Sequence, residues 1–328
     1  METRKLGKTG LVVGVMGAGC WQFGGDWGDI SDSQAMATLH AAADAGVTFF
    51  DTADVYGDGR SERLVGRLLA ERRGEGLVVA TKCGRRVPQE PANYTPQALR
   101  EWTERSLENL GIPSIPLTQL HCPPDGVYHD DAVFAALDQM VSEGLLGAYG
   151  VSVETVEQGL WALQRPGVAT VQVIFNAFRL KPTAKLLPAC QQAGVGVIVR
   201  VPLASGLLSG KYDEHTTFPA GDHRTYNRGG EAFDVGETFS GVPFQVGLAA
   251  ARRLQKTAVP DGWTLSEVAL RWCADGSGVS TVIPGARSPM QAVANAAVGS
   301  RPPLPESAVV EILSCYDEEI AQYVEHYW

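Results

Sequence analysis

Four residues at the ends of strand-like runs carry the side chains needed to protonate a carbonyl oxygen: Asp51, Tyr56, Lys82 and His121. A tyrosine with a pKa of about 10 is a poor acid at neutral pH, but a nearby ammonium favours the phenolate and lowers that pKa. Lys82 would act on Tyr56 in this way, and Asp51 would keep the lysine charged and in place. His121 would donate a hydrogen bond to the substrate oxygen. These residue types predict proton transfer to a carbonyl, with the hydride coming from elsewhere.

Each of the four residues also has an ordinary structural explanation. An aspartate and a tyrosine on a loop are commonly a turn former and a half-buried anchor. A lysine at a strand end is commonly a solvated flank, and a lone histidine there is commonly a structural hydrogen-bonding group. Their joint occurrence at consecutive strand ends favours the chemical interpretation, because the carboxyl ends of strands in α/β proteins converge on one pocket.

Strand-like and helix-like segments alternate along the chain, which predicts parallel strands joined by helical crossovers. Strands are expected at residues 15–19, 47–51, 77–82, 117–121, 147–151, 170–174, 195–200 and 280–283. Helices are expected between them at residues 33–45, 62–73, 95–110, 130–143, 154–164 and 182–193. Eight strands in such repeats fit a closed (β/α)8 TIM barrel better than an open sheet, whose strand order would have to reverse.

The remaining segments add detail to a single barrel domain spanning residues 1–328. Residues 4–13 look like a β-hairpin that would plug the bottom of the barrel. Helical patterns at residues 243–258, 264–275 and 306–325 include two that the barrel repeat does not require. The segment 212–240 is long for a barrel loop and would be either a lid over the ligands or a segment that is disordered without them.

Composition narrows the classes of function. The chain has 45% hydrophobic residues, 20% charged residues and 37 glycines, which suits a globular protein with many tight turns. A net charge of −10 without a run of Lys or Arg argues against a nucleic-acid partner. No apolar run approaches the roughly 18 residues of a membrane span, and no signal peptide is recognisable, so we expect a cytoplasmic protein. Six cysteines without a CxxC spacing predict neither a metal site nor a disulfide framework.

The motifs around the four residues resemble the aldo-keto reductase superfamily, including its potassium-channel β-subunit branch. The resemblance spans nearly the whole chain and rests on residues 50–57, Ala80-Thr81-Lys82, Leu120-His121, Gly150-Val151-Ser152, Val171-Gln172, residues 202–211 and residues 283–287. It implies a (β/α)8 barrel with Asp51, Tyr56, Lys82 and His121 as a catalytic tetrad. It also implies a nicotinamide cofactor bound without a Rossmann fold, and the sequence contains no GxGxxG motif.

The same resemblance implies which residues would contact the ligands. Ser152 and Gln172 would bind the nicotinamide carboxamide, and residues 202–207 with Lys211 would wrap the pyrophosphate. The full set of implied cofactor contacts is Cys20, Trp21, Asp51, Ser152, Gln172, Arg200, Pro202, Leu203, Ser205, Gly206, Leu207, Lys211, Arg224, Gly285, Arg287, Gln291 and Asn295. Implied substrate contacts are Trp21, Phe23, Trp27, Tyr56 and His121. NADPH is expected to be favoured over NADH, with Arg287 contributing most of the discrimination.

Two positions depart from the family pattern. Val153 stands where many members have Asn, which removes one partner of the carboxamide. Arg200 stands where an aromatic residue often stacks on the nicotinamide. A guanidinium can stack on a ring or reach for an anionic substrate, and the sequence leaves both roles open.

Three functions follow from the resemblance. The first is an NADP(H)-dependent oxidoreductase that reduces an aldehyde or ketone, such as a sugar-like aldehyde, to an alcohol. The second is a sugar or alcohol dehydrogenase running in the oxidative direction, since the same tetrad works both ways. The third is a cofactor-binding regulatory subunit, against which His121 argues because the potassium-channel β-subunit branch replaces that histidine.

Overall fold

The computed structural model describes residues 1–328 and contains a closed barrel of eight parallel strands. The strands are β3 (Ala18–Gly19), β4 (Phe49–Asp51), β5 (Val78–Cys83), β6 (Leu117–His121), β7 (Tyr149–Ser152), β8 (Val168–Ile174), β9 (Gly196–Arg200) and β10 (Val279–Val282). They pair in chain order. Parallel bridges from Met16 to Val282 and from Gly19 to Gly285 join the first strand to the last. The predicted (β/α)8 barrel is confirmed.

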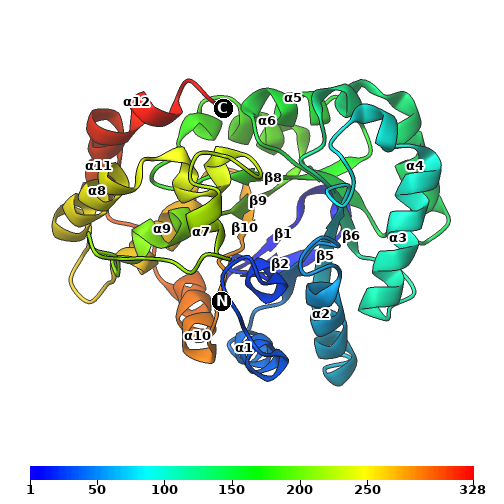
Figure 1. The fold of residues 1–328 in the computed structure, drawn as a ribbon, viewed down its shortest axis with the longest axis horizontal. Helices are drawn as coiled ribbons and strands as arrows, with labels where there is room; N and C mark the ends of the chain where they lie inside the picture. The colour runs from blue at the N-terminus through cyan, green and yellow to red at the C-terminus, as the bar shows by residue number, and fades with distance from the viewer.

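Helices surround the strands on the outside of the barrel (Figure 1). They are α1 (Asp32–Asp44), α2 (Arg60–Glu71), α3 (Pro96–Leu110), α4 (Asp131–Ser142), α5 (Val156–Ala162), α6 (Leu186–Ala193), α7 (His223–Tyr226), α8 (Phe244–Thr257), α9 (Leu265–Asp275), α10 (Pro289–Ala297), α11 (Glu306–Cys315) and α12 (Ala321–Val324). Both α8 and α9 lie between β9 and β10, and α11 and α12 follow α10. Figure 1 shows α8, α11 and α12 gathered on one side of the molecule. The chain therefore carries helices beyond the barrel repeat, as expected.

Side-chain caps fix several helix starts and so fix the ends of the loops that precede these helices. The hydroxyl of Thr95 accepts a hydrogen bond from the amide of Ala98 at the start of α3. Thr155 with Gln158 and Thr264 with Glu267 form capping boxes at the starts of α5 and α9. Each cap satisfies amide donors that the first helical turn leaves free.

The segment 306–325 is not one continuous α-helix. α11 ends at Cys315, a π-helical turn spans Tyr316–Ile320, and α12 follows. The wider turn interrupts the α-helical hydrogen-bond pattern while Tyr316 and Ile320 stay buried. Apolar spacing indicates a buried helical face but does not reveal such a turn, so the expected single helix is corrected to two.

An N-terminal hairpin closes one end of the barrel, as predicted. β1 (Thr3–Lys5) and β2 (Val12–Gly14) pair in antiparallel fashion. Leu6 and Val13 join a small core cluster with residues from the barrel strands, including Phe49 and Ile198. Gly7 has φ +53°, and a Cβ there would lie 2.1 Å from the amide nitrogen of Gly196. Only glycine allows the hairpin to approach the barrel this closely.

Candidate active site

Lys82 connects two members of the expected tetrad. Its Nζ lies 2.5 Å from Oδ1 of Asp51 and 3.4 Å from the hydroxyl oxygen of Tyr56. Nζ also donates to the carbonyl oxygen of Thr52 at 2.8 Å. The lysine side chain is 1% exposed. A buried ammonium needs such partners, because an unpaired charge would be strongly destabilised in the barrel interior.

Two glutamines hold the other oxygen of Asp51. Gln119 and Gln172 each donate from Nε2 to Oδ2 of Asp51, at 3.1 Å and 2.8 Å. The three residues come from β6, β8 and β4 and point into the barrel. Gln119 is not among the site residues expected from the sequence. Strand geometry could have indicated Gln119. Alternate residues of a strand share one face, and Gln119 lies two residues before His121.

Packing of the loop between β4 and α2 places Tyr56 next to the Asp51–Lys82 pair. Thr52 donates from its hydroxyl to Ser61 at 2.8 Å, and Ser61 donates to the carbonyl oxygen of Cys20 at 2.9 Å. The ring of Tyr56 stacks on Trp21, with centroids 6.1 Å apart and planes 20° apart. The hydrogen bond from Ser61 to Cys20 and the stacking of Tyr56 on Trp21 therefore hold this loop against the residues that follow β3.

Burial dominates the acidity of Tyr56. Removal from water raises the pKa of the phenol to about 12, although the Lys82 ammonium acts to lower it. The sequence-based expectation of a pKa below that of a free phenol is therefore wrong, because it weighed the ammonium without the burial. Tyr56 is protonated throughout the neutral range and holds a proton that can be donated.

His121 faces Tyr56 and is neutral. The two rings meet edge to face, with centroids 5.8 Å apart. Burial, followed by the charges of Arg85, Lys82 and Arg200, lowers the pKa of His121 well below its usual range. A neutral imidazole donates from only one nitrogen. Nδ1 is buried without a hydrogen-bond partner in the protein.

A second aspartate in the same loop is buried without full compensation. Asp54 is 1% exposed, and its Oδ1 has no hydrogen-bond partner. Burial and the charge of Glu62 raise the pKa of Asp54 to about 7. The unfolded value is about 3.9, so the folded protein binds this proton more tightly than the unfolded chain. The protonated Asp54 carboxyl therefore adds to the free energy of unfolding in full below about pH 4, and this contribution is lost as the pH rises towards 7.

Replacing Asp54 with Asn is expected to stabilise the protein more at pH 8 than at pH 5, because the neutral amide need not release a proton. From the two pKa values, the gap in unfolding free energy between variant and wild type should widen by about 3 kcal/mol over that interval. Urea unfolding at both pH values measures the gap, with the exposed Asp261→Asn as the matched control. A gap that does not change with pH would contradict the raised pKa.

A cavity of about 400 Å³ extends from the tetrad to the start of α10. It brings together most of the residues expected to contact cofactor or substrate: Cys20, Trp21, Trp27, Asp51, Tyr56, His121, Gln172, Arg200, Pro202, Leu203, Ser205, Gly206, Lys211, Arg224, Gly285, Arg287, Gln291 and Asn295. Its wall also includes residues that the sequence analysis did not single out, among them Gln22, Tyr212 and Glu237.

Four expected residues lie outside the wall of this cavity. Lys82 is buried behind Tyr56 and Asp51, where a residue that acts through them belongs. Ser152 and Leu207 are buried, with exposed fractions of 0% and 1%. Phe23 lines a separate, much smaller cavity against α1.

Arg200 lines the cavity with its charge already paired. Nη2 donates to the carbonyl oxygen of Val153 at 3.1 Å, and Nη1 lies 3.4 Å from Oε1 of Glu237. The same Oε1 accepts a hydrogen bond from Arg85 at 2.9 Å. Arg85 also pairs with Glu154 at 2.8 Å. These side chains form a partly buried ion-pair cluster beside His121, in which Arg200 and Glu237 are the buried members.

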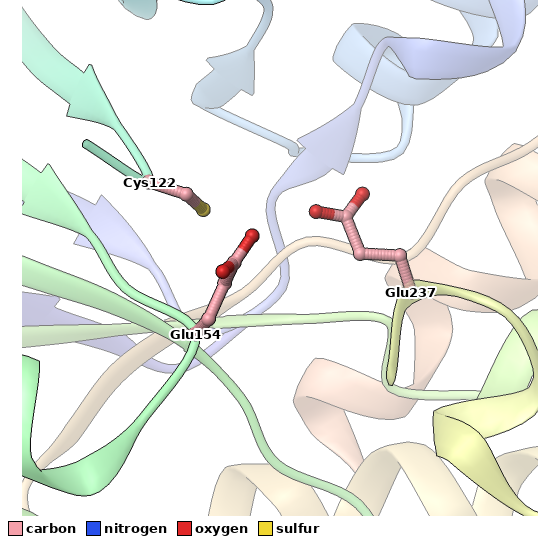
Figure 2. A group of neighbouring side chains, drawn as sticks. All are labelled: Cys122, Glu154 and Glu237. Carbon is pink, nitrogen blue, oxygen red and sulfur yellow. The ribbon is translucent and has the colours of Figure 1, made fainter. Parts of the chain in front are cut away.

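Two carboxylates and a thiol approach one another in this cluster (Figure 2). One ligand atom each of Cys122, Glu154 and Glu237 lies within 4.8 Å of the others. Figure 2 shows Glu237 entering from a different segment, with its carboxylate directed towards the other two side chains. Arginines already balance both carboxylates, and burial raises the pKa of the Cys122 thiol, which keeps it protonated. This donor set suits an ion-pair cluster better than a metal ion.

The segment 212–240 is folded against the barrel and supplies three side chains to the cavity wall. These are Tyr212, Arg224 and Glu237. Arg224 is held by Asp222 and by the hydroxyl of Tyr212. The backbone of Asp222 forms a bridge with Trp27, which joins the segment to the loop after β3.

At the far end of the cavity, Arg287 precedes α10. Its Nη2 donates to the carbonyl oxygen of Asp29 at 2.7 Å, and its amide donates to Gln291 at 2.8 Å. Nε is buried without a partner. Asn295 donates to the carbonyl oxygen of Gly285 at 3.2 Å. A guanidinium with spare donors near a helix N-terminus suits a phosphate group.

Comparison with known proteins agrees with this geometry. The family model described as "Aldo/keto reductase family" matches residues 15–317. The solved structure of the glycerol dehydrogenase AKR11B4 from Gluconobacter oxydans has a TM-score of 0.78 and 30% identity, with 98% of this chain and 96% of that chain covered. None of the helices combines the length and the apolar character that a membrane span requires.

The names of two relatives describe different functional roles. The aldo-keto reductase yakc from Schizosaccharomyces pombe, whose name specifies NADP(+), is 27% identical over 88% of this chain and 83% of that protein. A probable voltage-gated potassium channel subunit beta from Oryza sativa subsp. japonica is 29% identical over 90% of each chain. With a family match over nearly its whole length and a barrel that carries the expected tetrad, the chain belongs to the aldo/keto reductase family.

Proposed function

We propose that this protein is an NADP(H)-dependent oxidoreductase that reduces a small aldehyde or ketone to an alcohol, with Tyr56 as the general acid. The observation that carries the proposal is that Tyr56 and His121 meet at the wall of one cavity while Lys82, paired with Asp51, contacts the Tyr56 hydroxyl from behind that wall. Proton donation by a positioned acid and a hydrogen bond to the developing alkoxide are what carbonyl reduction requires of a protein.

The tetrad residues have distinct tasks in this reaction. Tyr56 donates its proton to the carbonyl oxygen, and the ammonium of Lys82 stabilises the phenolate that remains. His121 orients the oxygen by a hydrogen bond, since its imidazole is neutral. Asp51 balances the charge of Lys82, and Gln119 and Gln172 hold Asp51 in place. A bound nicotinamide cofactor supplies the hydride, which no side chain of the protein can provide.

The residues of the cavity fit such a cofactor. Four residues in the turn after β9 have positive φ: Val201, Ala204, Ser205 and Gly206. Left-handed conformations of this kind aim backbone amides into one concave surface, which suits the oxygens of a pyrophosphate. Lys211 lines the same cavity. The unpartnered Nε of Arg287 supplies a donor at the other end.

Oxidation of an alcohol is the reverse of the same reaction. It requires the phenolate of Tyr56 as a base, and burial raises the pKa of that phenol to about 12. Oxidation should therefore accelerate at alkaline pH, whereas reduction uses the protonated form that prevails at neutral pH. The glycerol dehydrogenase with the same fold keeps this direction open as a second function.

A regulatory role like that of the channel subunits is the other alternative. The structure retains His121 next to Tyr56 and a continuous cavity beside both, which a purely cofactor-binding subunit does not need. We propose small-molecule carbonyl compounds as the partners. A cytoplasmic location and the absence of a nucleic-acid partner stay predictions from the sequence.

A screen of aldehydes, ketones and polyols with NADPH, NADH and their oxidised forms tests the proposal. We expect oxidation of NADPH that depends on an aldehyde or ketone at neutral pH. Cofactor binding without turnover of any carbonyl or alcohol would support the regulatory alternative.

NADPH is expected to bind about ten- to a hundredfold more tightly than NADH, because Arg287 can form charge-assisted hydrogen bonds to a 2′-phosphate. Replacing Arg287 with Ala should remove most of this preference by weakening NADPH binding alone. Quenching of tryptophan fluorescence gives both dissociation constants, and the exposed Arg67→Ala serves as control. Equal constants in the wild type, or unchanged NADPH affinity in the variant, would refute this assignment.

A further inference from the structure

Glu237 lies at the wall of the cavity beside the catalytic residues. Tyr56, His121 and Glu237 all line the same cavity. A carboxylate oxygen of Glu237 lies within 4.8 Å of the sulfur of Cys122, the residue after His121. Figure 2 shows this carboxylate projecting from its own segment towards Cys122 and Glu154. A substrate positioned for proton transfer from Tyr56 would therefore lie within the same enclosure as Glu237.

The carboxylate has hydrogen-bonding capacity that the protein does not use. Arg85 donates to Oε1, and Arg200 pairs with the same atom, while Oε2 makes no hydrogen bond within the protein. Burial acts to raise the pKa of Glu237, but the charges of Arg85 and Arg200 outweigh it and leave the pKa below its usual range. Glu237 is thus ionised at neutral pH, and an ionised carboxylate only accepts hydrogen bonds.

Charges at this end of the cavity are balanced pair by pair. Lys82 is matched by Asp51, and Arg85 and Arg200 are matched by Glu154 and Glu237. A carboxylate or phosphate on the substrate would find no unpaired cation here and would meet the charge of Glu237. A hydroxyl group, in contrast, can donate to Oε2 without any change in charge.

Two tryptophans also line this cavity. Trp21 and Trp27 line the cavity, and their rings meet edge to face with centroids 5.5 Å apart. Indole faces offer apolar surface to C–H groups, so the enclosure combines an aromatic wall with a charge-assisted acceptor. This combination suits a small molecule with hydroxyl groups on a carbon chain.

We propose that Glu237 is a specificity-determining residue that accepts a hydrogen bond from a substrate hydroxyl, so that the enzyme prefers neutral hydroxylated carbonyl compounds. Compounds without the hydroxyl, or with a carboxylate in its place, are poorer substrates. The inference rests on the proposed carbonyl reduction. The charge of Arg200 is balanced by Glu237, which makes this guanidinium a weaker site for an anionic substrate than an unpaired one would be.

The first test uses the wild-type protein with three aldehydes: glyceraldehyde, propanal and succinic semialdehyde. With rates expressed per free aldehyde, kcat/KM for glyceraldehyde should exceed that for propanal by about tenfold or more. Succinic semialdehyde should be the poorest of the three. Equal values for glyceraldehyde and propanal would overturn the inference while leaving carbonyl reduction in place, whereas no turnover of any aldehyde would refute the proposed function itself.

The second test replaces Glu237 with Gln. Loss of the charge should lower the ratio of kcat/KM between glyceraldehyde and propanal by about tenfold. It should also raise kcat/KM for succinic semialdehyde, because Arg200 loses its partner. If Glu237 has only a structural role, the substitution would lower kcat/KM for all three aldehydes together and leave the ratio unchanged. That result would overturn the inference. Glu214→Gln is the matched control, since Glu214 lies in the same segment but pairs with Arg252 at the surface.

Because Glu237 also pairs with Arg85, the fold of each variant must be checked by its melting temperature. Glu237→Asp keeps the charge on a shorter side chain, and it should restore part of the preference for glyceraldehyde. A ratio in Glu237→Asp no higher than in Glu237→Gln would count against the carboxylate as the recognition group. Where a variant fails to fold, the wild-type comparison still tests the preference for hydroxylated substrates, and its absence would overturn the inference.

Discussion

Replacing Tyr56 with Phe is expected to lower kcat for carbonyl reduction by about 10²–10⁴-fold, the contribution typical of one positioned acid. The variant keeps the aromatic ring, and with it the stacking on Trp21. Only the hydroxyl that contacts Lys82 is lost. Affinity for NADPH should stay within severalfold, because the hydroxyl acts on the substrate oxygen. Steady-state kinetics and fluorescence titration measure the two effects separately.

Tyr149→Phe is the matched control for this change. Tyr149 is also a buried tyrosine of the barrel, but its hydroxyl pairs with Asp138 and does not line the cavity. We expect its kcat to stay near the wild-type value. Substantial turnover by Tyr56→Phe, with Tyr149→Phe unchanged, would remove the general acid from the proposed mechanism.

Replacing Lys82 with Met is expected to lower kcat at least as strongly. The ammonium stabilises the Tyr56 phenolate, and burial already raises the pKa of that phenol to about 12. Without Lys82 the pKa rises further, so proton donation in the transition state becomes less favourable. The change also leaves Asp51 with hydrogen bonds from Gln119 and Gln172 but no cation, which costs about 3–5 kcal/mol of stability for a buried pair.

The pH dependence of alcohol oxidation distinguishes a chemical role of Lys82 from a structural one. Oxidation needs the phenolate, so its rate rises with pH towards the pKa of Tyr56. In Lys82→Met this rise should move to higher pH, because the ammonium that lowers the pKa is gone. The double variant Asp51→Asn, Lys82→Met removes both charges and should regain stability without regaining activity. If the oxidation rate of Lys82→Met rises over the same pH range as that of the wild type, Lys82 does not act on the pKa of Tyr56.

The barrel could be predicted from sequence because local signals agreed with one another. Strand-like segments, helix-like segments and their eightfold alternation pointed to the same closed sheet. The tetrad could be recognised because Asp51, Lys82 and His121 each lie at or next to a strand end, and such ends converge in this fold.

Other features depend on contacts between distant parts of the chain. Gln119 and Gln172 reach Asp51 across 68 and 121 positions, and no sequence spacing relates them. The pKa of Tyr56 depends on how deeply the folded protein buries the ring. Glu237 lies in the segment 212–240, which has no periodic pattern, and its pairing with Arg85 and Arg200 arises only in the folded chain.

Transfer of deuterium from NADPH that carries deuterium in place of both hydrogens at the nicotinamide C4 tests the central claim most directly. The protein is incubated with the labelled cofactor and glyceraldehyde, and the product alcohol is analysed by mass spectrometry. We predict one deuterium on the former carbonyl carbon with the wild type, and label reduced at least a hundredfold in equal time with Tyr56→Phe. Alcohol formed without deuterium, or label transferred equally well by the Tyr56→Phe variant, would contradict direct reduction of a carbonyl with Tyr56 as the acid.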